Sequence, residues 1–450
     1  MNYGALSLRT LKATFNSLAF TKVFMILFNK LASFLCLLIL STQVNAEQSS
    51  LLTLQTAINI AVQDNPNLAQ IQARSEAMAA IPAQLGTLPD PVISFNALNL
   101  PVDSFDIAQE NMTQLQGGIS QAIPFPGKLA LREQTATYQA EAAVYDVTEA
   151  RCRLLRDVKQ RWWAIFYLDR ALEIISTNQQ LLRQFVQIAQ TKYVVGQGLQ
   201  QDVLLAQLEL SKLLDNEIKL TGARNKTRAQ LNTLLDRSAD QTALIPKEIS
   251  THLPALLTES DLFQQAENTR ALLASSRETI NAAQSRLDLA KKDIYPDFNV
   301  GAYYGGRSDT LSGQERADFL SLKLSMTVPL FAASKQHKAV DQRSSELMQQ
   351  RYALQDQWNQ VRTEISMAYS DFQQTKNQVI LYNSGIIPQA RQTVASMLAG
   401  YQVNKVDFLN LVRSQITLYN YETQYWKAFT QANQALAQLT SVVGKEDIYE

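Results

Sequence analysis

Hydrophobic and polar residues repeat with a helical period over two very long stretches of this 450-residue chain. The first, 128–195, contains no proline and no glycine, and it is rich in the helix-favouring residues Ala, Leu, Gln, Arg and Glu. At 1.5 Å per residue it would form a helix on the order of 100 Å long. Such a helix extends beyond any single globular core, so we expect it to pack along its length against other helices.

The second stretch, 335–403, has apolar residues at steps of three and four, which is the pattern of a coiled-coil seam. Pro388 lies inside this stretch and predicts a kink there. The seam positions are Val361, Ile365, Ala368, Phe372, Val379, Tyr382 and Ile386, with Thr375 in one slot.

The two stretches belong to an internal repeat. Pro89-Asp90 precedes the first long helix as Pro296-Asp297 precedes the second, an offset of 207 positions, and Tyr193 matches Tyr401 at an offset of 208. A period this long indicates a duplicated domain and not a solenoid of short units. We therefore divide the chain into a signal peptide (1–46), a first repeat (47–236), an inter-repeat equatorial linker (237–258), a second repeat (259–444) and a short polar tail (445–450).

Each repeat has the same predicted order of helix, β-hairpin, long helix and return helix. Asn65-Pro66 predicts a break early in the first helix. The expected elements are helices 54–85 and 262–294, strands 92–97, 115–123, 298–304 and 319–328, and return helices 202–235 and 407–440.

The four predicted strands alternate apolar and polar residues, most clearly in 319–328. By itself this alternation is more typical of an ordinary soluble antiparallel sheet. A membrane barrel uses similar strands of about ten residues, but four strands cannot cross lipid with open edges. Three copies would close a barrel of roughly twelve strands and would let the long helices form a tube. A trimer would therefore both close the open edges of the sheet and give the long helices neighbours in a tube.

The first 46 residues have the composition of a secretory signal peptide. They carry four basic residues and no acid, and Lys30 precedes the apolar run 31–40, after which Val44-Asn45-Ala46 forms a small-x-small end. We expect cleavage after Ala46, with Met25 as an alternative start. Without this segment the 41 basic residues fall to 37 against 41 acidic ones, a net charge of −4 that argues against a nucleic-acid partner.

No constellation of residues in the sequence indicates catalysis or a cofactor. There is no glycine-rich phosphate loop and no nucleophile elbow. His252 and His337 are the only histidines, and neither belongs to a cluster with metal-ligand spacing. After signal cleavage Cys152 is the only cysteine, so no internal disulfide can form and a packing role is expected. The chain is therefore not expected to be an enzyme.

Three motifs carry a resemblance to a known family, and it covers essentially the whole mature chain. They are Gln121…Pro124-Phe-Pro-Gly-Lys128, Tyr193-Val-Val-Gly…Asp202-Val-Leu-Leu-Ala-Gln207, and Tyr401…Asp407-Phe-Leu409. With the duplicated plan, they resemble the TolC family of outer-membrane efflux proteins. The stretch from Leu88-Pro-Asp-Pro-Val to Lys128 is most similar to the heavy-metal (CusC/CzcC-like) branch of that family.

The resemblance implies a mainly α fold with a β-barrel part. Three protomers of four strands each would form a 12-stranded outer-membrane barrel that continues into a periplasmic α-helical barrel. It also implies three kinds of partner besides outer-membrane lipid: further copies in a homotrimer, a periplasmic membrane-fusion adaptor and an inner-membrane RND-type transporter. The chain would be the exit duct of this tripartite pump, localised to the outer membrane of a Gram-negative bacterium.

The resemblance also assigns roles to residues by motif position. Asp202, Tyr401, Lys405 and Asp407 fall where the family closes its periplasmic gate. The tips Gly196, Gly198 and Asn404 would dock the adaptor, and Pro124, Pro126 and Gly127 would link strand to helix. Two positions depart from the family pattern: Asn404 replaces the usual tip glycine, and Asn410 replaces a second aspartate. A helix cap or first-turn acid is the favoured role of Asp202, whereas for Asp407 a cap and a gate residue are both open.

The sequence thus favours a duct that exports heavy-metal ions, although nothing in it holds a metal. Drug efflux and type I secretion are alternative uses of the same fold. A periplasmic coiled-coil adaptor is an alternative of a different class. An adaptor tends to have one helical hairpin, whereas this chain predicts two, each preceded by a β-hairpin at the equivalent position.

Overall fold

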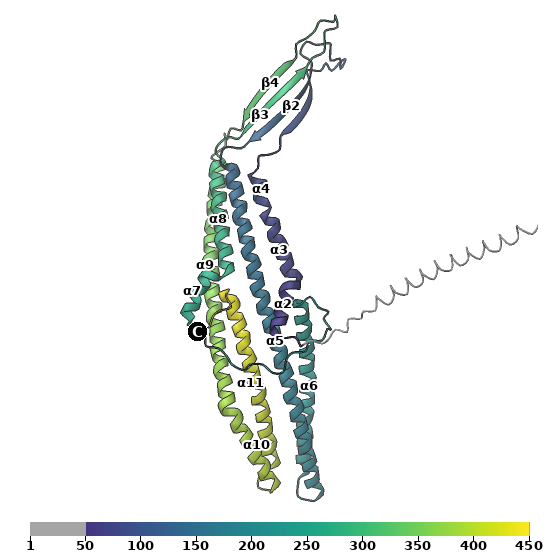
Figure 1. The fold of residues 1–450 in the computed structure, drawn as a ribbon, viewed down its shortest axis with the longest axis vertical. Coiled ribbons are helices and arrows are strands. Elements are labelled where there is room, and N and C mark those ends of the chain that lie inside the picture. Colours follow the sequence, from purple (N-terminus) through teal and green to yellow (C-terminus); the bar gives the residue numbers. More distant parts are fainter. Residues whose placement is uncertain (1–50, 450) are drawn as a thin grey trace, which may run out of the picture. The chain divides into compact units, whose positions relative to one another are not determined.

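The structure is a computed structural model that describes residues 51–449 (Figure 1). It confirms the four predicted strands and the predicted order of elements in both halves. The helices are α2 (Leu54–Asp64), α3 (Pro66–Ala79), α4 (Ile81–Gly86), α5 (Lys128–Val194), α6 (Gln200–Leu234), α7 (Glu259–Thr269), α8 (Ala271–Lys292), α9 (Gln336–Leu381), α10 (Ile387–Gln402) and α11 (Phe408–Val443), with a π-helical turn η1 (Tyr382–Ile386); the strands are β1 (Val92–Leu98), β2 (Gln114–Ile123), β3 (Phe298–Gly306) and β4 (Phe319–Met326). The predicted signal peptide lies outside the described residues.

The helix before each hairpin is broken at equivalent positions. Asn65 separates α2 from α3, as Pro66 predicted, and its side chain accepts a hydrogen bond from the Leu68 N–H at 3.0 Å. Arg270 separates α7 from α8 with nearly the same backbone angles. After the predicted break at Pro66, a continuous helix to residue 85 was expected, but a separate short helix, α4, begins at Ile81 with Pro82 in its first turn.

The coiled-coil seam of α9 is confirmed up to Val379, but its last predicted residue was wrong. Tyr382 is only partly buried, and Ile387 is buried in place of Ile386. The π-helical turn directly before Pro388 explains the shift, since it inserts one extra residue into the helix. The distortion that Pro388 predicted is therefore present as this turn.

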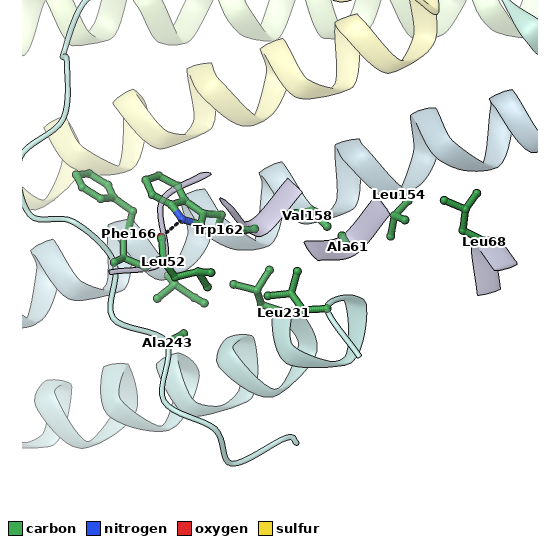
Figure 2. Close-up of a cluster of buried hydrophobic side chains, with 13 residues drawn as sticks. Leu52, Ala61, Leu68, Leu154, Val158, Trp162, Phe166, Leu231 and Ala243 are labelled. Carbon is green, nitrogen blue, oxygen red and sulfur yellow. Dashed lines mark hydrogen bonds between the residues drawn. The ribbon is translucent and has the colours of Figure 1, made fainter. Parts of the chain in front are cut away.

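One hydrophobic core ties the beginning of the described chain to the middle of α5. The Trp162 indole N–H donates to the Leu52 carbonyl at 2.9 Å, and Phe166 and Leu231 are fully buried beside it (Figure 2). Trp163 meets Phe429 of α11 edge to face. Both tryptophans are packing residues, as predicted. Within residues 51–449 no helix is both long and apolar enough to cross a membrane.

The strand register sorts the sheet into an apolar and a polar face. The sheet is antiparallel in the order β1-β2-β3-β4, and Ile93, Ile119, Ala302 and Leu322 lie in one row across it. Because side chains alternate along a strand, rows of like parity share a face. That face also carries Phe95, Leu115, Val300, Tyr304, Leu320, Leu324 and Met326, all exposed, whereas the other carries Ser94, Gln116, Ser120, Asn299, Ser321, Lys323 and Ser325.

The linker between the halves is irregular, as predicted, but it is anchored. The Leu52 N–H donates to the Leu244 carbonyl at 2.7 Å, and Leu256 forms a bridge with Tyr449. The C-terminal tail is polar except for Ile448, which is fully buried and whose carbonyl accepts from the Leu257 N–H at 3.2 Å. A single apolar residue is enough to fix the tail against the linker.

Candidate functional site

The C-terminal end of α5 and the end of α10 form two hairpin tips that share one hydrophobic cluster. Phe185 of α5 meets Phe408 of α11 edge to face, with ring centroids 6.4 Å apart, and Tyr401 lies 5.2 Å from the same ring. The cluster consists of Leu182, Phe185, Ala189, Ala206, Leu213, Tyr401, Phe408, Leu411 and Val412. The sites predicted at the two tips are therefore brought together by apolar packing.

The two tip turns have the same backbone design. Gly196 has φ +75°, and the Gln197 N–H donates to the Lys192 carbonyl at 2.8 Å. In the second tip Asn404 has φ +62°, and the Lys405 N–H donates to the Gly400 carbonyl at 2.8 Å. Both turns close their helix with a left-handed residue, which satisfies the last carbonyls. Asn404 thus occupies the conformation that glycine adopts in the first tip.

We expect Gly196→Ala to lower the free energy of unfolding by about 1–2 kcal/mol, because an L residue at positive φ is strained. Open space surrounds the added methyl group, so the cost is conformational alone. Gly222→Ala is the matched control, since its position is helical and equally open. It should raise the free energy of unfolding by about 0.5–1 kcal/mol. Denaturant unfolding of both variants measures this; equal effects would contradict it.

The acidic residues predicted at the tips lie near each other. Asp202 is in the first turn of α6, and Asp407 is the residue before α11 without a side-chain capping bond. Burial raises the pKa of Asp202, and the nearby Asp407 carboxylate raises it further, while the Leu199 backbone and Lys192 act in the opposite direction. The predicted first-turn position of Asp202 is confirmed. The Asp202 and Asp407 carboxylates of one protomer are therefore close enough to repel each other.

Tyr401 is buried, with 5% of its surface exposed. Its hydroxyl group has no hydrogen-bond partner within residues 51–449. Burial raises the pKa of this hydroxyl, and so does the Asp202 carboxylate. Lys405, the fourth predicted residue, is exposed. The Asp202 carboxylate thus lies close enough to Tyr401 to act on its hydroxyl group, whereas Lys405 is at the surface.

Sequence reasoning missed Lys192, which is the cation at this site. It lies in the last turn of α5, and its Nζ donates to the Tyr401 carbonyl at 2.7 Å and to Asn404 Oδ1 at 2.5 Å. The same Nζ lies 4.2 Å from the centroid of the Tyr401 ring. Its only sequence signal was a basic residue at a helix C-terminus, which the helix dipole alone would explain.

The strand-to-helix junction is built around a second lysine. Pro124 follows β2, the Pro126 carbonyl accepts a hydrogen bond from Lys292 Nζ at 3.3 Å, and Gly127, with φ +86°, is the residue directly before α5. The next residue, Lys128, is 2% exposed, and its Nζ lies 3.0 Å from Asp297 Oδ1 and 3.4 Å from Asp293 Oδ1. The junction between sheet and long helix is therefore joined to the second repeat by a buried charge.

In each repeat, the residue at the break in the first helix donates a hydrogen bond to the C-terminal end of the return helix. Asn65 donates to the Leu234 carbonyl at the end of α6, and Arg270, 205 positions later, donates to the Ser441 carbonyl at the end of α11. Arg270 also forms a buried ion pair with Glu149 of α5, with 2.9 Å between Nη2 and Oε1. The same design thus occurs twice, with a charge pair added in the second repeat.

No group of three or more His, Cys, Asp or Glu side chains in the described part of the chain is arranged to hold a metal ion. Cys152 is a free thiol, and burial raises its pKa.

Comparison with known proteins identifies the fold. The family model described as outer membrane efflux protein matches residues 57–237 and 262–445, which is most of the chain. The chain belongs to the outer membrane efflux protein family. The two matched segments coincide with the two halves that the structure repeats.

Two curated relatives of this efflux protein carry different names. The cobalt-zinc-cadmium resistance protein CzcC of Cupriavidus metallidurans is 20% identical over 89% of this chain and 91% of its own length. The alkaline protease secretion protein AprF of Pseudomonas aeruginosa is 23% identical over 65% of this chain and 62% of its own length.

Solved structures share the fold at low identity. The outer-membrane channel OprN superposes with a TM-score of 0.74 at 15% identity, covering 87% of this chain and 89% of its own. CusC gives a TM-score of 0.72 at 15% identity, covering 87% of this chain and 92% of its own. The TolC-like fold is therefore confirmed. This efflux protein is an outer-membrane transport duct and not an enzyme, so the adaptor alternative was wrong.

Proposed function

We propose that three copies of this efflux protein form the exit duct of a tripartite pump that exports heavy-metal ions. The match to CzcC over most of both chains carries the metal assignment. The duct itself would be passive toward its cargo, since the described residues present no cluster for a metal. Selection would then fall to an inner-membrane RND-type transporter, joined to the duct by a periplasmic membrane-fusion adaptor.

The sheet supports assembly into a trimer. Strands β1 and β4 are the edges of the four-stranded sheet, and each has one unpaired side within the described chain. In lipid such edges are costly, because no water is present to satisfy the backbone. Three sheets of four strands would close into a barrel of twelve, with the apolar face toward lipid and the polar face inside.

The tips support docking of the adaptor and gating of the duct. Several large apolar side chains stay exposed around Gly196, Gly198 and Asn404, which is typical of an interaction surface. They are Val194 (82% exposed), Val195 (60%), Leu199 (58%) and Val403 (62%). In this proposal Asp202, Tyr401, Lys405 and Asp407 form the periplasmic gate, and three copies of each acid surround the axis.

A susceptibility panel on a strain without this gene tests the cargo. It compares copper, silver, zinc, cobalt and cadmium salts with detergents, dyes and hydrophobic antibiotics. We expect selective sensitivity to metals, restored by the intact gene. Sensitivity to amphiphilic drugs alone would contradict the metal assignment and favour drug efflux. Loss of a secreted protein without any sensitivity would favour the secretion role that the name AprF suggests.

A further inference from the structure

One lysine joins the two hairpin tips of a protomer. Lys192 belongs to the α5–α6 tip, whereas both atoms that its Nζ contacts by hydrogen bonds, the Tyr401 carbonyl oxygen and Asn404 Oδ1, belong to the α10–α11 tip. The ammonium also lies over the face of the Tyr401 ring. A cation held by two oxygens and an aromatic face is a charge-assisted contact, which is stronger than a neutral hydrogen bond.

Asn404 has the two properties that this contact needs. Its φ of +62° is a conformation that asparagine tolerates better than most residues. Glycine would adopt the same conformation more easily, but it offers no side-chain oxygen to Lys192. The acceptor thus explains why asparagine stands at a position where the family pattern has glycine.

Gly198 makes room for the lysine. A Cβ atom at this position would lie 2.9 Å from Lys192 Cβ and 3.1 Å from the Tyr193 nitrogen. The α5–α6 turn therefore folds directly onto the base of the Lys192 side chain. This packing limits where the side chain can go and directs it across to the second tip.

The contact has no counterpart in the second repeat. The offset of 208 that aligns Tyr193 with Tyr401 places Gly400 opposite Lys192, and a glycine has no side chain to reach back. Gly400 instead accommodates Val406, whose Cγ2 would lie 2.6 Å from an added Cβ. Each protomer therefore has a single polar connection of this kind, directed from the first tip to the second.

We infer that Lys192 is a latch that holds the two tips of one protomer together and that Asn404 is its acceptor. The inference rests on the proposed gate at the tips, because it assigns the residue that keeps the hairpins from separating. Release of the latch would also move away the Lys192 charge, which acts on Asp202 in opposition to the Asp407 carboxylate. Both effects favour separation of the tips.

The latch is tested by distance measurements on the purified full-length protein. Spin labels at Val194 and Val403, in a Cys152→Ser background and diluted with unlabelled protomers, report the separation of the two tips by pulsed electron resonance. Lys192→Met removes the charge and donors while keeping an unbranched side chain, and Asn404→Gly removes only the acceptor. Asn404→Gly should shift the balance from latched to unlatched tips roughly tenfold, as expected for loss of one charged hydrogen bond. Lys192→Met should shift it at least as far, because it also removes the contacts with Tyr401.

Two control variants make the result specific. Lys219→Met removes one charge from the same hairpin at a site that is 68% exposed, and it should leave the distances unchanged. Asn404→Asp keeps an oxygen acceptor at the same backbone position and should stay latched. The double variant Lys192→Met/Asn404→Gly should equal Lys192→Met, because without the ammonium Asn404 has no donor left to accept from. An unchanged distance distribution in Lys192→Met and Asn404→Gly would overturn the latch.

Single-channel conductance in planar bilayers separates the latch from the proposed gate. If the tips separate and conductance rises in the two latch variants, both the latch and the gate are supported. If the tips separate while conductance stays at the wild-type level, the latch stands and the gate at these tips is refuted. If conductance rises while the distances stay fixed, Lys192 is no latch and acts on the channel by another route.

Discussion

Replacing Glu149 with leucine is expected to lower the free energy of unfolding by about 3–5 kcal/mol, because it leaves the Arg270 guanidinium buried without its partner. Arg270 is 6% exposed and Glu149 is 4% exposed, with 2.9 Å between Nη2 and Oε1. Burial lowers the pKa of Arg270, yet a guanidinium does not deprotonate in proteins. The uncompensated charge therefore cannot be relieved by loss of a proton.

Guanidinium unfolding in detergent, followed by tryptophan fluorescence at fixed protein concentration, measures this cost. The double variant Glu149→Leu/Arg270→Leu should recover part of the lost stability, since apolar replacement of a whole buried pair is often tolerated. Arg153→Ala is the control, because this side chain contacts the same Glu149 oxygen but is 53% exposed. It should cost about 0–1 kcal/mol. Strictly additive effects in the double variant would show that the pair is not coupled.

The sequence predicted the elements and their order because the periodic pattern extends over very long segments. In 128–194 the absence of proline and glycine indicated a helix, and in 319–326 the alternation of apolar and polar residues indicated a strand. Proline marked the break before Pro66 and the distortion before Pro388. These features are local, so a single sequence contains enough information to place them.

Contacts between distant residues were not predictable in the same way. Lys192 and Asn404 are 212 positions apart, and Glu149 and Arg270 are 121 apart, so no local pattern joins them. The repeat aligned the two tips, but it could not reveal a contact that only one repeat supplies. The burial of Ile387 in place of Ile386 was not predicted for a different reason. The π-helical turn adds one residue and so rotates the following residues around the helix, and no pattern of apolar residues in the sequence marks such a turn.

The double variant Asp293→Asn/Asp297→Asn is expected to lower the free energy of unfolding by about 3 kcal/mol, near the low end of the range for uncompensated buried charges. It leaves the charge of Lys128, which is 2% exposed, without a negatively charged partner, and only neutral acceptors such as the Tyr295 carbonyl at 3.0 Å remain. The cost stays at the low end because the two carboxylates are 48% and 40% exposed and are already partly solvated. Denaturant unfolding measures it, with Asp341→Asn, an exposed acid paired to Lys338, as the control.

The pH dependence of stability distinguishes a charge effect from a general loosening of the junction. Burial opposes ionisation of Asp297, but the Phe125 N–H and Lys128 hold the pKa of Asp297 below its usual value. An acid whose pKa is lower in the folded state stabilises the protein above its unfolded pKa, and this contribution is lost as the pH falls through the folded pKa. Asparagine does not titrate, so the double variant should lose less stability on acidification than the wild type. Parallel acid curves would show that Lys128 does not depend on these carboxylates, and the junction would then rest on the stacking of Phe125 on Tyr295.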